Sequence, residues 1–406
     1  MGSQILELLD ELTLDAAIEN SAKKLEKETI ALRRALHEIP ELSWQEEKTI
    51  ALIKRELEST LKDSPYTWRL KEMRGGLVVD LDINSKFNRL LFRADCDALP
   101  IHEQTNLPFA SKHPGVMHAC GHDAHSAILL SALKAIVLED ITPKNNLRFV
   151  WQRAEEVSYP QSGGNSLVEE GVCADIESVF GLHIVSNEKS GVFASRPGAM
   201  LSNSAQIHME IRASGGHVMS PHFGSNAIDI ATDLHMVLRG FAQRTLGPNE
   251  VYSFTPSISN SGVQSNIRPH SAQITYAFRN YLSEERYEDF IGKLKRKVSH
   301  IAECYDGGHL ETFSTIRGYP QLINDPHSYH KSESLIANIG FETSLSPIGF
   351  AAEDFAYYLQ EKPGVFWFLG ADRGNSHDHH TPKFDIDEGA LYKGVAYWLL
   401  LAANPL

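Results

Sequence analysis

Residues 117–125 read Met117-His118-Ala119-Cys120-Gly121-His122-Asp123-Ala124-His125, and an apolar, helix-like run over 126–137 follows directly. A thiolate and an imidazole two residues apart, where a loop enters a helix, can face one point and bind a borderline metal such as zinc. The packing of a helix requires no such cluster. The stretch therefore predicts a metal site at the start of a helix.

Short strand-like and helix-like segments alternate on both sides of this stretch. Residues 16–60 predict two helices that separate near Pro40. Apolar runs predict strands over 76–82, 89–94, 147–152 and 178–183, and the helix after Cys120 falls between the second and the third. Such alternation is typical of an α/β fold, in which a mixed, largely parallel sheet is sandwiched by helices.

Residues 203–316 predict a different order of strands and helices. Strands are predicted over 205–211, 252–258, 272–279 and 310–316, with helices over 226–242 and 284–304. The order β-α-β-β-α-β is that of a ferredoxin-like α+β domain. We therefore expect one domain made of residues 1–202 and 317–406, with the ferredoxin-like domain 203–316 inserted in it. The chain should end in a helix capped near Asp385 or Asp387.

Length, charge and cysteine spacing favour a multidomain globular protein over a nucleic-acid-binding or membrane protein. A chain of 406 residues exceeds one ordinary core, and its formal net charge of −14 disfavours nucleic-acid binding. The N-terminus is unlike a signal peptide, and the longest apolar run, 395–403, is too short to cross a bilayer, so no membrane association is expected. Four widely spaced cysteines form no disulfide framework, which fits the cytoplasm.

Three of the predicted strands end in polar residues that a core would not choose. These residues are Asp95 with Asp97, Glu155 with Glu156, and His183. Each set alone is a weak signal, because strand ends usually emerge into solvent. In open α/β sheets, however, sites form at the carboxyl ends of strands. With Cys120 and His122 they give a set of metal-type ligands at one edge of one sheet.

The adjacent Glu155 and Glu156 allow two interpretations. Neighbours on a strand point to opposite faces, and on its own the pair fits a solvated acidic turn. At a strand end, however, the chain can turn and present both side chains. One carboxylate would then bind metal while the other takes a proton from the attacking water, a division of labour that a hydrolase needs.

A second histidine cluster, His377-Asp378-His379-His380, lies more than 250 residues beyond the first. A purification tag does not fit, because a further helix follows the segment. At least one of these histidines is expected to complete the site, but spacing alone does not say which.

Nine motifs together carry a family resemblance. They are Arg33-Arg-Ala-Leu-His37-Glu-Ile-Pro40-Glu41, Arg93-Ala-Asp95-Cys-Asp97, His118-Ala-Cys120-Gly-His122-Asp-Ala-His125, Ala154-Glu155-Glu156, Gly181-Leu-His183, Gly215-Gly-His217, Pro221-His222, Glu353-Asp354-Phe355 and His380-Thr-Pro-Lys-Phe384. With them the chain resembles the dinuclear metal amidohydrolases of the aminoacylase and carboxypeptidase superfamily. It is most similar to the branch of N-acyl-amino-acid amidohydrolases, indoleacetyl-amino-acid hydrolases, hippurate hydrolases and N-acetyl-diaminopimelate deacetylases.

The resemblance implies two divalent metal ions per subunit, zinc or manganese, with cobalt as a third option. Their ligands would be Cys120 as a candidate bridge, His122, Glu156, His183 and His380. Glu155 would be the general base, which activates water and then protonates the leaving amine. Asp97 would not bind metal itself but would hydrogen-bond one of the ligands and so fix its orientation.

Four further residues of the inserted domain gain roles from the resemblance. In relatives the histidine equivalent to His217 reaches the active site of the partner subunit and stabilises the tetrahedral oxyanion. That implies a homodimer formed through residues 203–316, which would act as lid and dimerisation domain. Asn266 and Arg279 would bind the substrate carboxylate, for which an arginine fork is suited, and His222 would contribute to substrate binding.

The sequence departs from the branch at several positions. Cys96 stands where relatives have methionine, and Arg268, in the turn 266–269, replaces an apolar residue. Arg153 stands where relatives commonly have proline, and a cation near Glu155 predicts a lower pKa for that base. None of these changes removes a ligand or the base.

The leading hypothesis is a metal-dependent amidohydrolase that removes the acyl group from an N-acyl amino acid or similar conjugate. A dipeptidase or carboxypeptidase of the same fold is an alternative, and it would need a pocket for an α-ammonium group that no motif reveals. A catalytically silent homologue that binds an acyl-amino acid is a further alternative, disfavoured because Glu155 and every implied ligand are present.

Overall fold

The structure is a computed structural model that describes residues 14–139, 141–157, 161–374 and 377–405. Two compact units divide the chain. The first takes in Met1–Met200, Ile323–Pro347 and Glu353–Leu406, and the second Leu201–Leu322 with Ile348–Ala352. The short segment Ile348–Ala352 joins the second unit because Gly349 pairs with Leu201 and its carbonyl accepts from the Tyr281 hydroxyl.

An eight-stranded sheet forms the centre of the first unit. Its strands, in spatial order, are β1 (Thr67–Met73), β2 (Gly76–Asp82), β4 (Asn146–Gln152), β3 (Arg89–Asp95), β5 (Ser178–Lys189), β16 (Gly364–Asp372), β6 (Phe193–Ser195) and β15 (Thr343–Leu345). The four strands from β4 to β16 run parallel, whereas β1, β2 and β6 introduce antiparallel pairs. The predicted fold class, a mixed and largely parallel sheet between helices, is confirmed.

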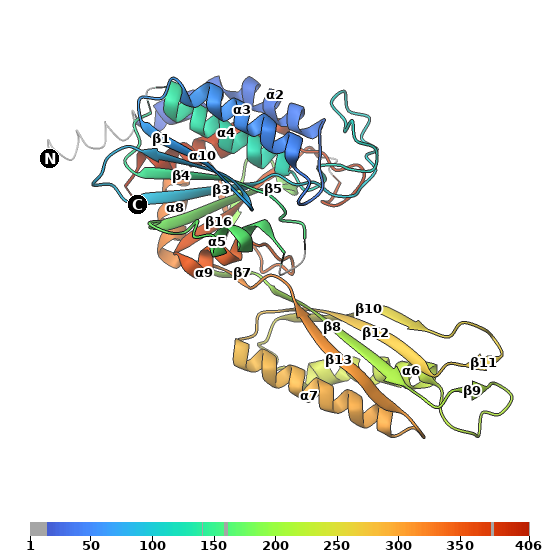
Figure 1. Cartoon of the computed structure of the whole chain (residues 1–406). Helices are drawn as coiled ribbons and strands as arrows, with labels where there is room; N and C mark the ends of the chain where they lie inside the picture. The colour runs from blue at the N-terminus through green and yellow to red at the C-terminus, as the bar shows by residue number, and fades with distance from the viewer. Residues whose placement is uncertain (1–13, 140, 158–160, 375–376, 406) are drawn as a thin grey trace. The chain divides into compact units, whose positions relative to one another are not determined.

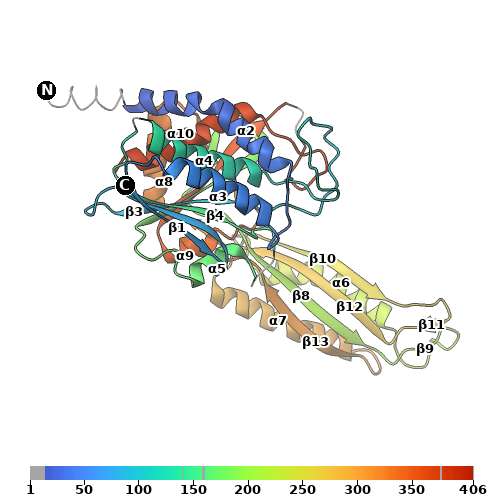
Figure 2. The same ribbon diagram turned by 45° about the horizontal axis from the view of Figure 1, so that its top comes forward.

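Helices cover both faces of this sheet (Figure 1). On one face lie α4 (His122–Leu138) and α10 (Leu391–Ala403), with α2 (Glu26–His37) and α3 (Glu47–Leu61) packed over α4. On the other face lie α5 (Gly163–Glu169) and α9 (Ala356–Glu361). Both views show α4 enclosed by the outer helices and the sheet (Figure 2). Burial on all sides explains why 122–137 is apolar around its circumference.

The structure tests three predictions about where helices and strands begin and end. Pro40 does separate α2 from α3, but a turn at Leu25 divides the first predicted helix. The predicted end of β5 at His183 is wrong, because β5 continues to Lys189 while it pairs with β16. The Asp387 carboxylate accepts from Gly389 N at 3.0 Å and caps the short turn Glu388–Ala390 that leads into α10.

The second unit has the predicted ferredoxin-like order of elements. These are β8 (Asn203–Arg212), α6 (Ala227–Thr245), β10 (Tyr252–Ser261), β12 (Ser271–Asn280), α7 (Glu284–Glu303) and β13 (His309–Arg317). The antiparallel sheet has the order β10-β12-β8-β13, and both helices contribute to its apolar core. A separate ladder pairs β9 (Gly216–His217) with β11 (Ile267–Arg268).

Another helix of the first unit, α8 (Pro326–Asn338), packs on β16, where the Trp367 indole donates to the Ser332 hydroxyl at 2.9 Å. None of the helices in the described ranges combines the length and apolarity that a bilayer crossing requires.

Candidate active site

Six of the side chains predicted for the site converge where β3 and β4 end and α4 begins. They are Cys120, His122, Glu155, Glu156, His183 and His380, and their potential ligand atoms form overlapping groups of three that lie within 4.8 Å of one another. Glu156 Oε1 is 3.2 Å from His380 Nε2 and 3.9 Å from His122 Nε2. Cys120 Sγ is 3.5 Å from His183 Nε2.

Gly121 makes the turn that lets the side chains of Cys120 and His122 point into the same space. It precedes α4 with a φ of 91°, a left-handed conformation that glycine adopts without a steric cost. The thiol before it and the imidazole after it therefore reach the same space from the loop and from the helix. This is the geometry that the Cys-Gly-His spacing predicted.

His122 is held from behind by Asp97. The His122 Nδ1 lies 3.0 Å from Asp97 Oδ1, so Nδ1 carries a proton and Nε2 is turned into the site. That Nε2 is buried without a hydrogen-bond partner among the described residues, and it faces Glu156 Oε1, whose nearest printed partner is the His380 ring at 3.2 Å. A buried imidazole nitrogen without a partner is costly unless something bridges it to the carboxylate. A cation between an imidazole lone pair and a carboxylate satisfies both, so the residues present fit a divalent metal.

Hydrogen bonds separate the histidines that can bind metal from those that cannot. His183 Nδ1–H donates to the Ile184 carbonyl at 2.7 Å, which leaves the Nε2 lone pair facing Cys120. His125, by contrast, uses Nδ1 for Asp95 at 2.6 Å and Nε2 to accept from Ile184 N at 2.8 Å. Both of its nitrogens are occupied, and His125 therefore supports the site without entering it.

The same reasoning distinguishes the histidines near the C-terminus. His379 Nε2 accepts from Ser186 N at 3.2 Å, and the ring packs against His183 and Phe384. His380 has a φ of 61°, and this turn directs its ring to Glu156. His377 contributes its carbonyl, which accepts from the Ser186 hydroxyl. Of the three, His380 is the one whose ring nitrogen meets the ligand cluster.

The comparisons with known proteins identify the family of this chain. Residues 91–404 match the model of Peptidase family M20/M25/M40. The chain belongs to this family. It is 33% identical over 389 residues to N-acetyl-L-cysteine deacetylase of Bacillus subtilis, covering 94% of this chain and 89% of that protein. It is 31% identical over 398 residues to thermostable carboxypeptidase 1 of Saccharolobus solfataricus, covering 95% and 98%.

A solved M20-family structure extends the likeness to the fold. A Bacillus subtilis protein, described as a dinuclear metal binding peptidase, matches with a TM-score of 0.79 at 28% identity, covering 94% of this chain and 98% of that one. The resemblance drawn from the motifs is thus confirmed. The expectation of an enzyme that hydrolyses amide bonds is confirmed at the level of the M20 family.

Negative charge dominates the electrostatics of this M20-family site. Burial lowers the pKa of His122, but the Asp95 and Asp97 carboxylates outweigh it and raise that pKa to about 10. Burial, then Glu353 and Glu156, raise the pKa of Glu155 well above its ordinary value. Positive charge placed among these groups would relieve both effects, which is a second way in which the site fits divalent cations.

The expectation that Arg153 lowers the pKa of Glu155 is wrong. The Arg153 guanidinium lies 4.0 Å from Glu72 on β1. Burial, and then the charges of Glu353 and Glu156, raise the pKa of Glu155 instead.

The Glu353-Asp354 pair of the family motif supports the segment that follows the two glutamates. Asp354 accepts from Arg93 Nη2 at 2.7 Å, Gln152 Nε2 at 2.8 Å and Gly164 N at 2.9 Å. All of these groups are buried around the end of β4. The sequence singled out the motif but gave no indication of these partners, which lie about 200 residues away along the chain.

Glu46 is a further part of the site that the sequence did not reveal. Its carboxylate accepts from Ala154 N at 2.8 Å, and Ala154 has a φ of 51°, which is unfavourable for a residue with a side chain. Glu46 therefore fixes the turn that carries Glu155. Glu46 and Glu47 resemble the acidic residues common at helix N-termini, so no sequence signal marked either one.

The other four predicted residues lie in the second unit. His217, His222 and Asn266 are exposed on the loops joined by β9 and β11, and Arg279 is half-buried on β12. His217 Nδ1 accepts from Met219 N at 3.1 Å, so in the neutral ring Nε2 carries the proton and can donate. Burial lowers the pKa of the Arg279 guanidinium, and no described acid pairs with it.

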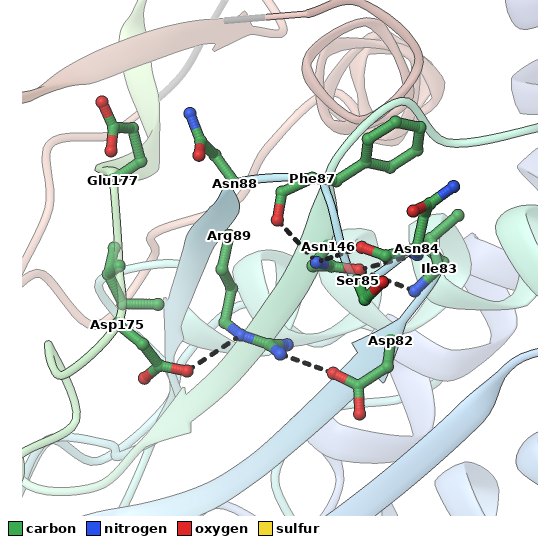
Figure 3. Close-up of a pocket in the computed structure, with 11 residues that line it drawn as sticks. Asp82, Ile83, Asn84, Ser85, Phe87, Asn88, Arg89, Asn146, Asp175 and Glu177 are labelled. Carbon is green, nitrogen blue, oxygen red and sulfur yellow. Dashed lines mark hydrogen bonds and ion pairs between the residues drawn. The ribbon is translucent and has the colours of Figure 1, made fainter.

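A cavity of about 650 Å³ lies at the opposite end of the strands, where β3 and β4 begin (Figure 3). Several of its polar groups pair with one another. Arg89 pairs with Asp82 at 2.5 Å and with Asp175 at 3.4 Å, and the Asn146 amide bonds the backbone of Ile83 at 2.7 Å and Phe87 at 2.8 Å. The chemistry-bearing cluster is at the other edge of the sheet, and we assign no site to this cavity.

Proposed function

We propose that the chain is a metal-dependent amidohydrolase that releases the amino acid from N-acyl amino acids or related conjugates. The observation that carries the proposal is the buried His122 Nε2, which has no hydrogen-bond partner among the described residues and lies 3.9 Å from Glu156 Oε1 in the ligand cluster. The residues that would hold two divalent ions are Cys120, His122, Glu156, His183 and His380. Zinc, manganese or cobalt bound there would supply Lewis-acid activation of water and of the amide carbonyl.

In this proposal the chain's own groups move the proton. Glu155 accepts a proton from the attacking water and delivers it to the nitrogen of the leaving amine. The position of Glu155 supports this role, because its carboxylate lies in one group with His122 and Glu156 whose ligand atoms are within 4.8 Å of one another. Asp97 keeps the proton of His122 on Nδ1 and also accepts from Glu156 N at 2.9 Å. One aspartate thereby aligns two of the proposed ligands.

Binding of the substrate is assigned to the second unit. His217 Nε2–H would donate to the developing oxyanion, which is worth about 3–4 kcal/mol for donors of this kind. Arg279, half-buried and without an acidic partner in the described residues, would bind the substrate carboxylate together with Asn266 and His222. We also propose a homodimer through residues 203–316 and a cytoplasmic location, which the unpaired Cys96, Cys120, Cys173 and Cys304 fit.

The test is amine release from N-acetyl, N-benzoyl and N-indoleacetyl amino acids by chelated protein and by protein reloaded with Zn²⁺, Mn²⁺ or Co²⁺. Glu155→Gln should lose at least a hundredfold in kcat while elemental analysis still finds two ions per chain. The control is Glu169→Gln, at an exposed position at the end of α5, and it should retain full activity. Full activity of Glu155→Gln would refute its role as base.

A peptidase is the second candidate, because the carboxypeptidase of Saccharolobus solfataricus is a relative over nearly the whole chain. Unprotected dipeptides belong in the same panel, and a preference for them over acyl amino acids would favour that candidate. No release with any metal, in protein that binds two ions and acyl-amino acids, would favour the catalytically silent homologue.

A further inference from the structure

We propose that Arg268 is a positioning residue, which ties together the two ends of the loop 215–224 and thereby fixes the direction of the His217 ring. The proposal rests on the function proposed above, in which His217 donates to the oxyanion. His217, His222 and several neighbours on this loop are exposed, so few side chains pack it in place. Arg268 lies beneath it and is only 8% exposed.

The guanidinium of Arg268 donates to four backbone carbonyls of the loop. Nη2 donates to Gly215 O at 3.0 Å and to Phe223 O, and Nη1 donates to Pro221 O and Gly224 O, both at 3.4 Å. Gly215 begins the loop and the other three carbonyls end it. An arginine can make these contacts at once because its donors are arranged in a rigid planar fork.

The pairing of β9 with β11 places Arg268 beside the residue that precedes His217. Arg268 is opposite Gly216, and Ile267 is opposite His217. Gly216 has a φ of 131°, and a Cβ added there would lie 2.7 Å from Arg268 Nη2. The absence of a side chain at Gly216 therefore gives the guanidinium its path below the loop.

The orientation of the His217 ring depends on the closed form of the loop. Met219 N donates to His217 Nδ1 at 3.1 Å, and Ser220 N donates to the His217 carbonyl at 3.0 Å. Both bonds come from the stretch between the two ends that Arg268 joins. If the ends separate, these amides lose their fixed place, and so does the Nε2–H on the far side of the ring.

The surroundings of Arg268 fit a backbone tie better than an ion pair. No described acidic side chain pairs with it, so carbonyl dipoles alone compensate the buried charge. An apolar side chain of similar size could fill the same space but would leave the four carbonyls without this donor. The arginine therefore contributes hydrogen bonds that hold the loop in one conformation, and not only packing volume.

The experiment compares Arg268→Met and Arg268→Lys with wild type, in the full-length, metal-loaded protein. Amide hydrogen exchange should become at least tenfold faster over 215–224 in Arg268→Met, and by less in Arg268→Lys, which retains one donor group. The matched control is Arg317→Met. Arg317 also makes several bonds, to Glu284 and Glu288, but it pairs with Ala205 at the opposite end of β8 from this loop.

Kinetics then test whether the tie acts through His217. Arg268→Met should lower kcat about tenfold. In a His217→Ala background the same substitution should lower kcat no further, because the group it positions is gone. Unchanged exchange over 215–224, or kcat losses that multiply in the double variant, would overturn the proposal.

The failure of the proposed function gives a different result. If wild type hydrolyses no amide, exchange alone decides whether Arg268 holds the loop. If His217→Ala keeps full activity, the role given to His217 is refuted, and the positioning role of Arg268 with it. If Arg268→Met does not fold, Arg268→Lys carries the test by the same two measurements.

Discussion

Replacing Glu46 with glutamine should stabilise the protein at alkaline pH. Glu46 is fully buried, and one carboxylate oxygen accepts from Ala154 N at 2.8 Å while the other has no partner among the described residues. Burial, and then the nearby Asp97, raise the pKa of Glu46 to about 7. Near neutral pH and above, the protein therefore holds a buried charge that is only partly compensated.

The sign and size follow from linkage. Because the folded pKa is raised, the stability that this proton contributes is fully present below the unfolded pKa of 4.5 and is lost as pH rises through about 7. That interval corresponds to about 3 kcal/mol. Glutamine keeps an oxygen for Ala154 N and never ionises. Glu46→Gln should thus gain up to about 3 kcal/mol over wild type above neutrality, or roughly 3–5 °C in Tm for a chain of this size.

The assay is thermal unfolding of metal-loaded wild type and variant at about pH 5 and about pH 8. The difference between the two proteins should be larger at the higher pH. Glu47→Gln is the matched control, since it removes the same charge from an exposed neighbour in the first turn of α3. Equal gains from both variants, or no gain from Glu46→Gln at pH 8, would refute the reasoning.

Three further predictions concern the ligands and the support of the site. His380→Ala should lower metal affinity at least tenfold, whereas His379→Ala should keep two ions per chain and lower Tm instead; elemental analysis after dialysis distinguishes them, and the reverse pattern would contradict the ring assignments. Chelation should lower Tm and added Zn²⁺ or Mn²⁺ should restore it, because ions that bind the folded state stabilise it; an unchanged Tm would argue against a metal at this cluster. Gly164→Ala should cost about 1–3 kcal/mol in urea unfolding, because its Cβ would lie 2.6 Å from Asp354 Oδ2, and a neutral result would mean that Asp354 moves freely.

The sequence predicted those parts of the fold that depend on local pattern. Alternation of short apolar runs with helical periods gave the central sheet and the ferredoxin-like order. It did not give the end of β5, because the partner that extends this strand, β16, lies nearly 200 residues later. The two-residue strands β9 and β11 carry no periodicity at all, and only their pairing makes them visible.

For the candidate site, too, some features could be predicted from the sequence and others could not. The ligands of one edge could be grouped because strand ends of a parallel sheet meet, which needs only the order of elements. The sequence could not show which of His377, His379 and His380 reaches the cluster. The answer depends on the φ of His380 and on Ser186, which donates to the His379 ring and to the His377 carbonyl. The effect of Arg153 on Glu155 could not be predicted, because nearness in sequence does not fix where a long side chain points, and the Arg153 guanidinium reaches Glu72.

The position of Glu155 depends on residues that are remote from it in sequence and that act from opposite sides. From the α3 side, Ser43 donates to Asp97 at 2.7 Å, and Glu46 holds Ala154 N. From the α5 side, Asp354 holds Gly164 N, just beyond the turn. The turn itself contributes a strained φ at Ala154, which the chain would not adopt unaided. As the base proposed above, Glu155 held this way would not need to reorganise when substrate binds, and changes at these supports should alter kcat even though none of them touches the reacting atoms.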